Sequence, residues 1–202
     1  MAYKVAVLMG SPNDGEKMAP VAETLERYGV EADVRVMSAH RSPALVAGFV
    51  TGARDAGYSA IICGAGMAAH LAGAAAAHTT LPVVGIPLSG GAINGWDALL
   101  ATVQMPGGVP VATFGANSGG PVNAALFAAR LLAVSDSALA QRVEDHRQQQ
   151  KEAVRAKDAR LQFHHLQHGI DVGCVQGGLK GRLQLIGQFA ALGAQRGGVL
   201  AV

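Results

Sequence analysis

Short apolar runs alternate along the chain with longer segments in which apolar residues recur at helical spacing. Each run is about the length of a strand and almost continuously apolar: Val5–Met9, Asp33–Met37, Ser59–Cys63, Pro82–Leu88 and Pro110–Phe114. Continuous apolar character is typical of strands that are buried on both faces. Because strands and helices alternate, the pattern predicts an α/β fold with a parallel sheet and helices on both of its sides.

The segments between the runs predict the helices. Val21, Leu25 and Tyr28 fall on one face of the first segment. In the second segment the corresponding face is formed by Leu45, Val46, Phe49 and Val50. Further helices are expected over Met67–His78, Gly95–Gln104, Val122–Val134 and Asp136–Leu161. The last of these is long and highly charged, which predicts a helix that is solvated or that reaches a neighbouring subunit.

The C-terminal part of the chain, residues 163–202, differs from the rest. It is rich in Gly, Leu and Gln and shows no clear period. We therefore expect a domain at residues 1–162, followed by a tail at 163–202 that is disordered or loosely packed. The histidines His164, His165 and His168 begin this tail, but no carboxylate or thiolate lies at ligand spacing, so no metal site is expected.

Composition narrows the class of protein. Half of the 202 residues are hydrophobic, 4% are aromatic and 15% are charged, as in a folded domain. The net charge of +2 is too small to imply a nucleic-acid partner. The two cysteines, Cys63 and Cys174, form neither a metal motif nor a disulfide framework, which favours a cytoplasmic location. We expect no signal peptide and no membrane partner, because no apolar stretch reaches membrane length.

The residues best suited to binding and catalysis come directly after the predicted strands, where an open parallel sheet binds its ligands. Gly10 and Ser11 follow the first strand and precede a helix, which suits an anion because backbone N–H groups point outward there. Asp14 can accept hydrogen bonds from ribose hydroxyls. The alternative is that Asn13 or Asp14 only caps the helix.

His40 and Arg41 follow the second strand and give the sharpest signal. Charge at the end of a buried strand is costly unless a ligand uses it. Arg41 can pair with a phosphate, and His40 can transfer protons near neutral pH. Alternatively, both are surface residues ahead of a helix that starts at Ser42-Pro43. His70, after the third strand, is either a site residue or a structural residue at the start of an alanine-rich helix.

Five separate blocks of sequence resemble the 5-(carboxyamino)imidazole ribonucleotide mutase family, the catalytic subunit of phosphoribosylaminoimidazole carboxylase. In chain order the blocks are Met9-Gly10-Ser11-x-x-Asp14, Ser38-Ala39-His40-Arg41-x-Pro43, Gly64-Ala65-Gly66-x-Ala68-Ala69-His70-Leu71, Gln104-Met105-Pro106-x-Gly108-Val109-Pro110-Val111-Ala112-Thr113 and Asn123-Ala124-Ala125-Leu126. The resemblance extends roughly from Val5 to Leu161, and the block that starts at Gln104 is strong evidence by itself.

The resemblance implies a three-layer, flavodoxin-like domain, usually assembled as a homo-octamer with sites at the subunit junctions. It also implies conversion of 5-(carboxyamino)imidazole ribonucleotide to 4-carboxy-5-aminoimidazole ribonucleotide in de novo purine (IMP) biosynthesis. The reaction would proceed by decarboxylation and recarboxylation within a closed site. The family reaction uses no metal, nucleotide or organic cofactor, so we expect none.

Residue by residue, the resemblance gives each loop a role. His40 and His70 are expected to be catalytic, with His40 moving a proton to and from the ring carbon. Ser11, Asp14 and Arg41 are expected to bind the ribose phosphate. The other expected contacts with the substrate, including the loop that holds carbon dioxide, are Gly10, Ser38, Ala39, Gly64, Ala65, Gly66, Ala68, Leu71 and Ser89.

Several positions depart from the family pattern. Glycine is usual where Met67 stands, proline where Ala72 stands and a hydroxyl residue where Ala98 stands. Met67 is expected to bring a bulky side chain into the carbon dioxide loop.

Two alternative functions are considered. A second branch of the family carboxylates aminoimidazole ribonucleotide with free carbon dioxide, and it commonly has lysine where Arg41 stands, so Arg41 favours the mutase branch. A flavodoxin-like module that binds a nucleotide or flavin without catalysis is also compatible with the architecture. Such a module predicts aromatic residues beside the bound ring, and the strand-end loops contain no Trp or Tyr.

Overall fold

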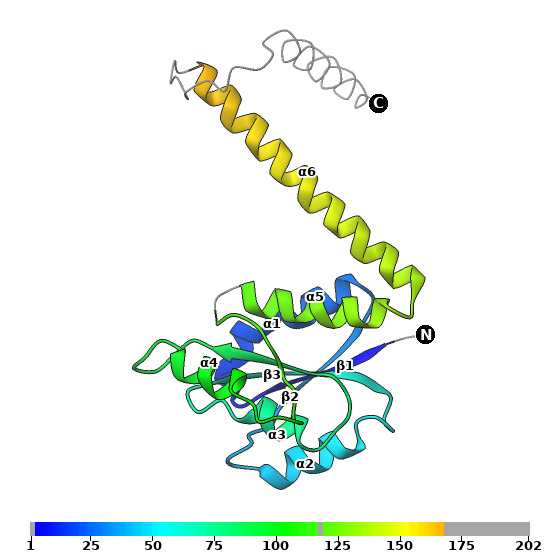
Figure 1. The fold of residues 1–202 in the computed structure, drawn as a ribbon, viewed down its shortest axis with the longest axis vertical. Helices are drawn as coiled ribbons and strands as arrows, with labels where there is room; N and C mark the ends of the chain where they lie inside the picture. The colour runs from blue at the N-terminus through cyan, green and yellow to red at the C-terminus, as the bar shows by residue number, and fades with distance from the viewer. Residues whose placement is uncertain (1–2, 117–118, 168–202) are drawn as a thin grey trace, which may run out of the picture. The chain divides into compact units, whose positions relative to one another are not determined.

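The computed structural model describes residues 3–116 and 119–167 (Figure 1). It contains five strands, β1 (Lys4–Met9), β2 (Glu31–Val36), β3 (Tyr58–Gly66), β4 (Val83–Leu88) and β5 (Ala112–Thr113). All of them pair in parallel, in the order β2-β1-β3-β4-β5. This is the flavodoxin-like strand order, so the predicted fold class is confirmed.

Helices cover both faces of the sheet (Figure 1). α1 (Gly15–Arg27) and α5 (Gly119–Ala133) pack on one face. α2 (Pro43–Gly52) and α3 (Leu71–Ala76) pack on the other. α4 (Trp96–Val103) lies on the same side as α3, because Thr102 and Ala72 both approach the face of β4 at Gly85. A short 3-10 helix, η1 (Pro12–Asp14), joins β1 to α1.

The central strands are buried on both faces, as their apolar sequence predicts. Along β1, Val5 and Val7 face α1 and α5, whereas Ala6 and Leu8 face α2 and α3. All four are fully buried. Burying a side chain of the size of valine or leucine stabilises a fold by about 1.5–3 kcal/mol, so this strand is a main source of stability for the sheet.

The prediction of two buried faces is wrong for β2. Val34 and Val36 are 47% and 48% exposed in the chain. The reason is position in the sheet, because β2 is an edge strand that pairs with β1 alone. The predicted buried face of α2 is also partly wrong. Val46 and Val50 are buried, but Leu45 is 55% exposed, since one residue of helix rotates a side chain by about 100°.

The third predicted helix is shorter than expected. It was predicted over Met67–His78, and α3 contains only Leu71–Ala76. Met67 has a φ of 51°, in the left-handed region, so it cannot belong to a right-handed helix. β5 is likewise reduced to two residues of the predicted run Pro110–Phe114.

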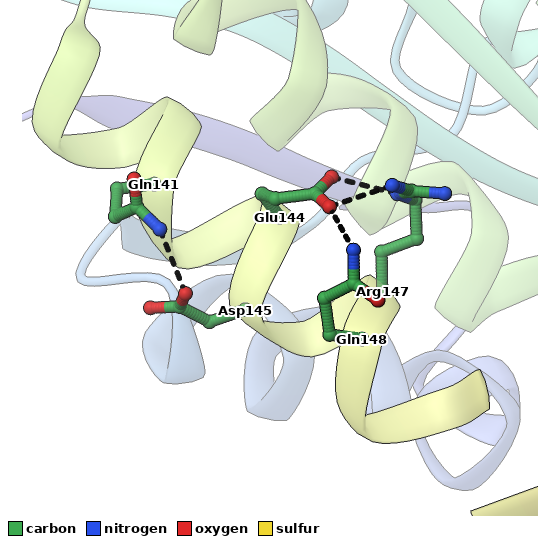
Figure 2. A network of polar contacts seen from close by, with 5 residues as sticks. All are labelled: Gln141, Glu144, Asp145, Arg147 and Gln148. Atoms are coloured by element: carbon green, nitrogen blue, oxygen red, sulfur yellow. Dashed lines mark hydrogen bonds and ion pairs between the residues drawn. The ribbon is translucent and has the colours of Figure 1, made fainter. Parts of the chain in front are cut away.

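α6 (Ser137–Gln167) is the long charged helix, and it begins and ends somewhat later than predicted. The Asp136 carboxylate accepts a hydrogen bond from the Leu139 backbone N–H at 2.9 Å, so Asp136 caps the helix. Farther along, Gln141, Glu144, Asp145, Arg147 and Gln148 form a network of polar contacts (Figure 2).

The chain divides into two compact units after Gln149. Residues 150–161, which begin the second unit, are exposed. Of the predicted tail, residues 163–167 continue α6, and residues 168–202 lie outside the described part of the chain. Within the described residues, no helix is both long and apolar enough to cross a membrane.

Candidate active site

The loops after β1, β2, β3 and β4 all emerge at the carboxyl edge of the sheet. The chain passes from β1 outward to β2 and then back across β1 to β3, so the strand order reverses between β1 and β3. Open α/β sheets bind ligands in the crevice that such a reversal leaves. The Gly10 backbone N–H donates to the Gly64 carbonyl at 3.3 Å, so the loop after β1 starts directly beside the last residues of β3.

The loop after β1 presents a hydroxyl and a carboxylate. Ser11 caps η1, because its Oγ accepts from the Asn13 backbone N–H at 3.3 Å. Asp14 occupies the N-cap position of α1 but makes no side-chain cap hydrogen bond. Helix capping therefore does not explain why a carboxylate stands at position 14. Burial raises its pKa above the ordinary value, while a hydrogen bond from the Ser11 backbone and the charge of Lys17 act in the opposite direction.

The loop after β2 brings Arg41 over the loop after β1. Arg41 Nη2 donates to the Gly10 carbonyl at 2.7 Å. Its backbone N–H and its Nε lie 3.3 and 3.4 Å from Ser38 Oγ, and Ser42 Oγ donates to the Ser38 carbonyl at 3.0 Å. Ser38 thus helps to hold the guanidinium at the Gly10 carbonyl. Arg41 is exposed in the single chain, so the expected cost of a charge at a buried strand end does not apply to it. Its place in the site rests on its contacts with Gly10 and Ser38.

His40 and His70 form a hydrogen-bonded pair across the second and third loops. His40 Nε2 and His70 Nδ1 are 2.7 Å apart, and the two rings are nearly perpendicular, with their centroids 4.9 Å apart. One of these nitrogens must donate and the other accept, so the pair shares a single proton at this contact. His70 stands at the N-cap of α3 and makes no cap hydrogen bond with its side chain. The pair is suited to proton transfer with a ligand in the crevice.

The end of β3 and the loop after it consist of small residues, and packing explains part of that. Gly64, Ala65 and Gly66 were expected to lie in the loop, but they belong to the strand. A β-carbon at Gly64 would lie 2.2 Å from Met18 Sδ, and one at Gly66 would lie 3.2 Å from the Leu88 carbonyl oxygen. Ala65 is half-buried and Ala68 is exposed. Ala39, in the loop after β2, is half-buried and packs against the core of the α2 and α3 face. Small residues at these positions leave open backbone near the crevice.

Two predicted contacts look different in the structure. The Leu71 side chain is 2% exposed and belongs to the core, so any contact there with a substrate has to come from the main chain. Met67 was expected to place its side chain inside the carbon dioxide loop, but the side chain points out of it. Its side chain is 62% exposed and reaches toward Gly91, where an added β-carbon would lie 3.4 Å from Met67 Cγ. Its left-handed backbone explains why glycine suits this position.

The end of β4 adds a cation that sequence reasoning missed. Lys17, in the first turn of α1, donates from Nζ to the Ser89 carbonyl at 2.6 Å. A cavity of about 440 Å³ opens here, lined by Glu16, Lys17, Pro20, Pro87, Leu88, Ser89, Ala116 and Pro121. The only signal in the sequence was the position of Lys17, three residues after Asp14.

Other features of the described residues lie apart from this edge. A second cavity, of about 500 Å³, is lined by Thr51, Arg54, Asp55, Ala77, His78, Thr79 and Thr80, in segments that precede β3 and β4. Burial raises the pKa of the Cys63 thiol to about 12, so it is not a nucleophile at neutral pH. In the part of the chain that is described, no group of three or more His, Cys, Asp or Glu side chains is placed to hold a metal ion.

Comparison with known proteins adds independent evidence. The chain matches the family described as AIR carboxylase over residues 4–153. It is 49% identical to the N5-carboxyaminoimidazole ribonucleotide mutase of Brucella melitensis over 154 residues, which cover 76% of this chain and 95% of that protein. The protein of the same name from Bacillus subtilis is 45% identical over 150 residues, or 74% and 93%. The crystal structure of Treponema denticola PurE aligns with a TM-score of 0.72 and 25% identity, over 78% of this chain and 98% of that one.

Proposed function

The chain belongs to the AIR carboxylase family, and we propose on that premise that it is a 5-(carboxyamino)imidazole ribonucleotide mutase. It converts this ribonucleotide to 4-carboxy-5-aminoimidazole ribonucleotide, a step of de novo purine biosynthesis. The enzyme is an isomerase, because the carboxylate moves from the exocyclic nitrogen to the ring carbon of the same substrate. The observation that carries the assignment of the site is the His40–His70 pair, with its 2.7 Å contact at the carboxyl edge of the sheet.

The reaction requires two proton movements that cancel. When the carbamate loses carbon dioxide, its N–C bond breaks and the nitrogen gains a proton. When the ring carbon attacks carbon dioxide, a C–C bond forms, and the ring carbon must then lose its proton to restore aromaticity. His40 and His70 already share one proton, so the pair can supply the first and accept the second. We assign the proton transfer at the ring carbon to His40 and a supporting catalytic role to His70.

Substrate binding is assigned to the loops on either side of the strand reversal. Arg41 contacts the carbonyl of Gly10, the residue before Ser11, so a guanidinium and a hydroxyl are available at the loop after β1 to bind the phosphate. The half-buried Asp14 carboxylate suits the ribose hydroxyls. The small residues from Gly64 to Ala68 leave space for the carboxylate and for the released carbon dioxide. Exclusion of water from this space keeps carbon dioxide beside the ring.

The site is open in the single chain, since His40, Arg41, His70 and Ser89 are all exposed. Closure therefore requires a further surface, and we include a homo-octamer in the proposal, with a neighbouring subunit covering each site. Exposed apolar side chains on and before α4 support this assembly: Ile93, Trp96, Leu100 and Val103. Cysteine usage supports a cytoplasmic location, with Cys63 a free thiol.

The test is an assay of the purified chain with two substrates side by side. We expect rapid turnover of 5-(carboxyamino)imidazole ribonucleotide without added bicarbonate. Aminoimidazole ribonucleotide should react only when bicarbonate is high. Equally rapid turnover of aminoimidazole ribonucleotide at low bicarbonate would instead identify a direct carboxylase. A yellow protein that turns over neither substrate would identify a flavin-binding module.

A further inference from the structure

Lys17 connects two loops that are not neighbours in the sheet. It belongs to α1, which follows β1, and its ammonium reaches the Ser89 carbonyl at the end of β4. Because β3 lies between β1 and β4, the side chain spans from the helix after β1 past β3 to the end of β4. The ammonium therefore lies at the carboxyl edge of the sheet, where the loops of the candidate site also emerge.

The contact with Ser89 leaves Lys17 able to bind a ligand. An ammonium has three N–H donors, and the Ser89 carbonyl occupies one of them. Among the described residues, no carboxylate forms an ion pair with Lys17 within 4.0 Å. Both Lys17 and Ser89 line the cavity of about 440 Å³. The arrangement is a cation at the wall of a cavity, held by a neutral acceptor.

Charge on the other side of the same loop indicates which group Lys17 would meet. Arg41 reaches the Gly10 carbonyl from the loop after β2, and the charge of Lys17 acts on Asp14 at the other end of the loop after β1. Two cations therefore flank the loop from Gly10 to Asp14. The reacting carboxylate is assigned to the His40–His70 pair, so the oxyanion that meets both cations at this loop is the phosphate.

We propose that Lys17 is a further substrate-binding residue, whose ammonium binds the 5′-phosphate of the ribonucleotide together with Arg41. The Ser89 carbonyl holds the ammonium while no substrate is bound. The proposal rests on the function proposed above, since it takes a ribonucleotide as the ligand. It gives the phosphate two cations rather than one, in keeping with its charge of about −2.

Calorimetric titration of the full-length protein with ribose 5-phosphate tests this directly, because the probe has a phosphate and no carboxylate. In Lys17→Gln the dissociation constant should rise about tenfold, the ratio expected for one charged hydrogen bond. Lys17→Arg should keep most of the affinity. Arg27→Gln is the matched control, since Arg27 is an exposed cation in the last turn of the same helix, and it should bind like the wild type.

A second titration uses the carboxylated product nucleoside, which lacks the phosphate. Lys17→Gln should bind it as the wild type does, and weakening confined to this probe would overturn the assignment to phosphate. Equal affinity of the wild type and Lys17→Gln for ribose 5-phosphate, or no binding by the wild type, would also overturn it. A fall in Tm with unchanged affinity would show that Lys17 only tethers Ser89. Since no turnover is needed, an inactive wild type would refute the proposed reaction without deciding this result.

Discussion

The polar contacts of the α6 network in Figure 2 and those at the carboxyl edge of the sheet join residues at very different separations along the chain. On α6, Arg147 pairs with Glu144 three residues away, and Gln141 pairs with Asp145 four residues away (Figure 2). At the carboxyl edge, His40 and His70 are 30 residues apart, and Lys17 and Ser89 are 72 apart.

The difference separates two uses of the same chemical groups. Contacts at three or four residues need only one helix, and each stabilises it by about 0.2–0.5 kcal/mol. Contacts across 30 or more residues exist only once the sheet has formed, so the whole fold determines their geometry. Long-range polar contacts at a strand end therefore indicate a site, and short-range contacts on an exposed helix indicate a solvated surface.

The comparison would fail most clearly if the long-range histidine pair were dispensable. We expect His40→Asn to fold normally and to lose activity by about 100- to 10,000-fold, the usual contribution of a general acid or base. His78→Asn is the control, because the His78 ring contacts the Ala74 carbonyl four residues earlier and lies at the second cavity, not at the site. Steady-state kinetics and Tm measure both variants. More than half of the wild-type rate in His40→Asn would remove this residue from the mechanism.

Arg41 tests whether a long-range contact positions a binding group. In Arg41→Ala we expect KM to rise at least tenfold with a smaller change in kcat, since a charged hydrogen bond is worth about 1.5–3 kcal/mol. The control is Arg54→Ala, because Arg54 donates to Thr80 at the second cavity and not at the site. An unchanged KM in Arg41→Ala would mean that the phosphate binds elsewhere.

A long-range contact outside the site should affect stability rather than activity. Tyr58 donates to the Asp33 carboxylate, and Arg35 Nε donates to it at 2.9 Å. We expect Tyr58→Phe to lower the free energy of unfolding by about 1 kcal/mol. Tyr28→Phe is the matched control and should cost nothing, because among the described residues the buried Tyr28 hydroxyl has no hydrogen-bond partner. Urea denaturation of both variants decides this, and equal losses would contradict it.

The same contact predicts a dependence on pH. Burial alone would raise the pKa of Asp33, but the hydrogen bonds from Tyr58 and Arg35 outweigh burial and lower it. A carboxyl whose pKa is lowered by folding adds stability above its ordinary value of 3.8, and this stability is lost as the pH falls below that value. In Tyr58→Phe the difference from the wild type should therefore shrink on acidification.

The smallest effect is expected on α6. Arg147→Gln removes a pair whose two side chains are both more than 40% exposed, so the free energy of unfolding should hardly change. Activity should not change. At about 1 M salt the difference from the wild type should disappear, because charges are screened within roughly 3 Å. A clear loss of stability, or one independent of salt, would show that this network does more than solvate the helix.

The sequence was informative where one local pattern decides the outcome. Apolar runs located β1, β3 and β4, which are internal strands of the sheet and are buried on both faces. They misjudged β2, because only the assembled sheet determines which strand is at the edge, and Val34 and Val36 are exposed for that reason. The left-handed backbone at Met67 was also missed, because methionine is not typical of such a conformation, although the family resemblance puts glycine at this position.

The same limit applies to the site. The position of His40 and His70 after successive strands indicated that they would share an edge, but not that their rings would meet at 2.7 Å. Lys17 was missed because its partner Ser89 lies 72 residues away and contributes a backbone carbonyl, which every residue has. The sequence shows which side chains can donate or accept hydrogen bonds, and only the folded chain shows which main-chain groups lie within reach of them.

The packing of Met18 against Gly64 has a consequence for how this sequence can change over generations. A β-carbon at Gly64 would lie 2.2 Å from the Met18 sulfur, so a larger residue 64 requires the Met18 side chain to move or to be replaced by a shorter one. Met18 is the neighbour of Lys17, and Gly64 accepts the hydrogen bond from Gly10. A lineage that enlarges residue 64 should therefore more often carry a shorter residue 18 as well.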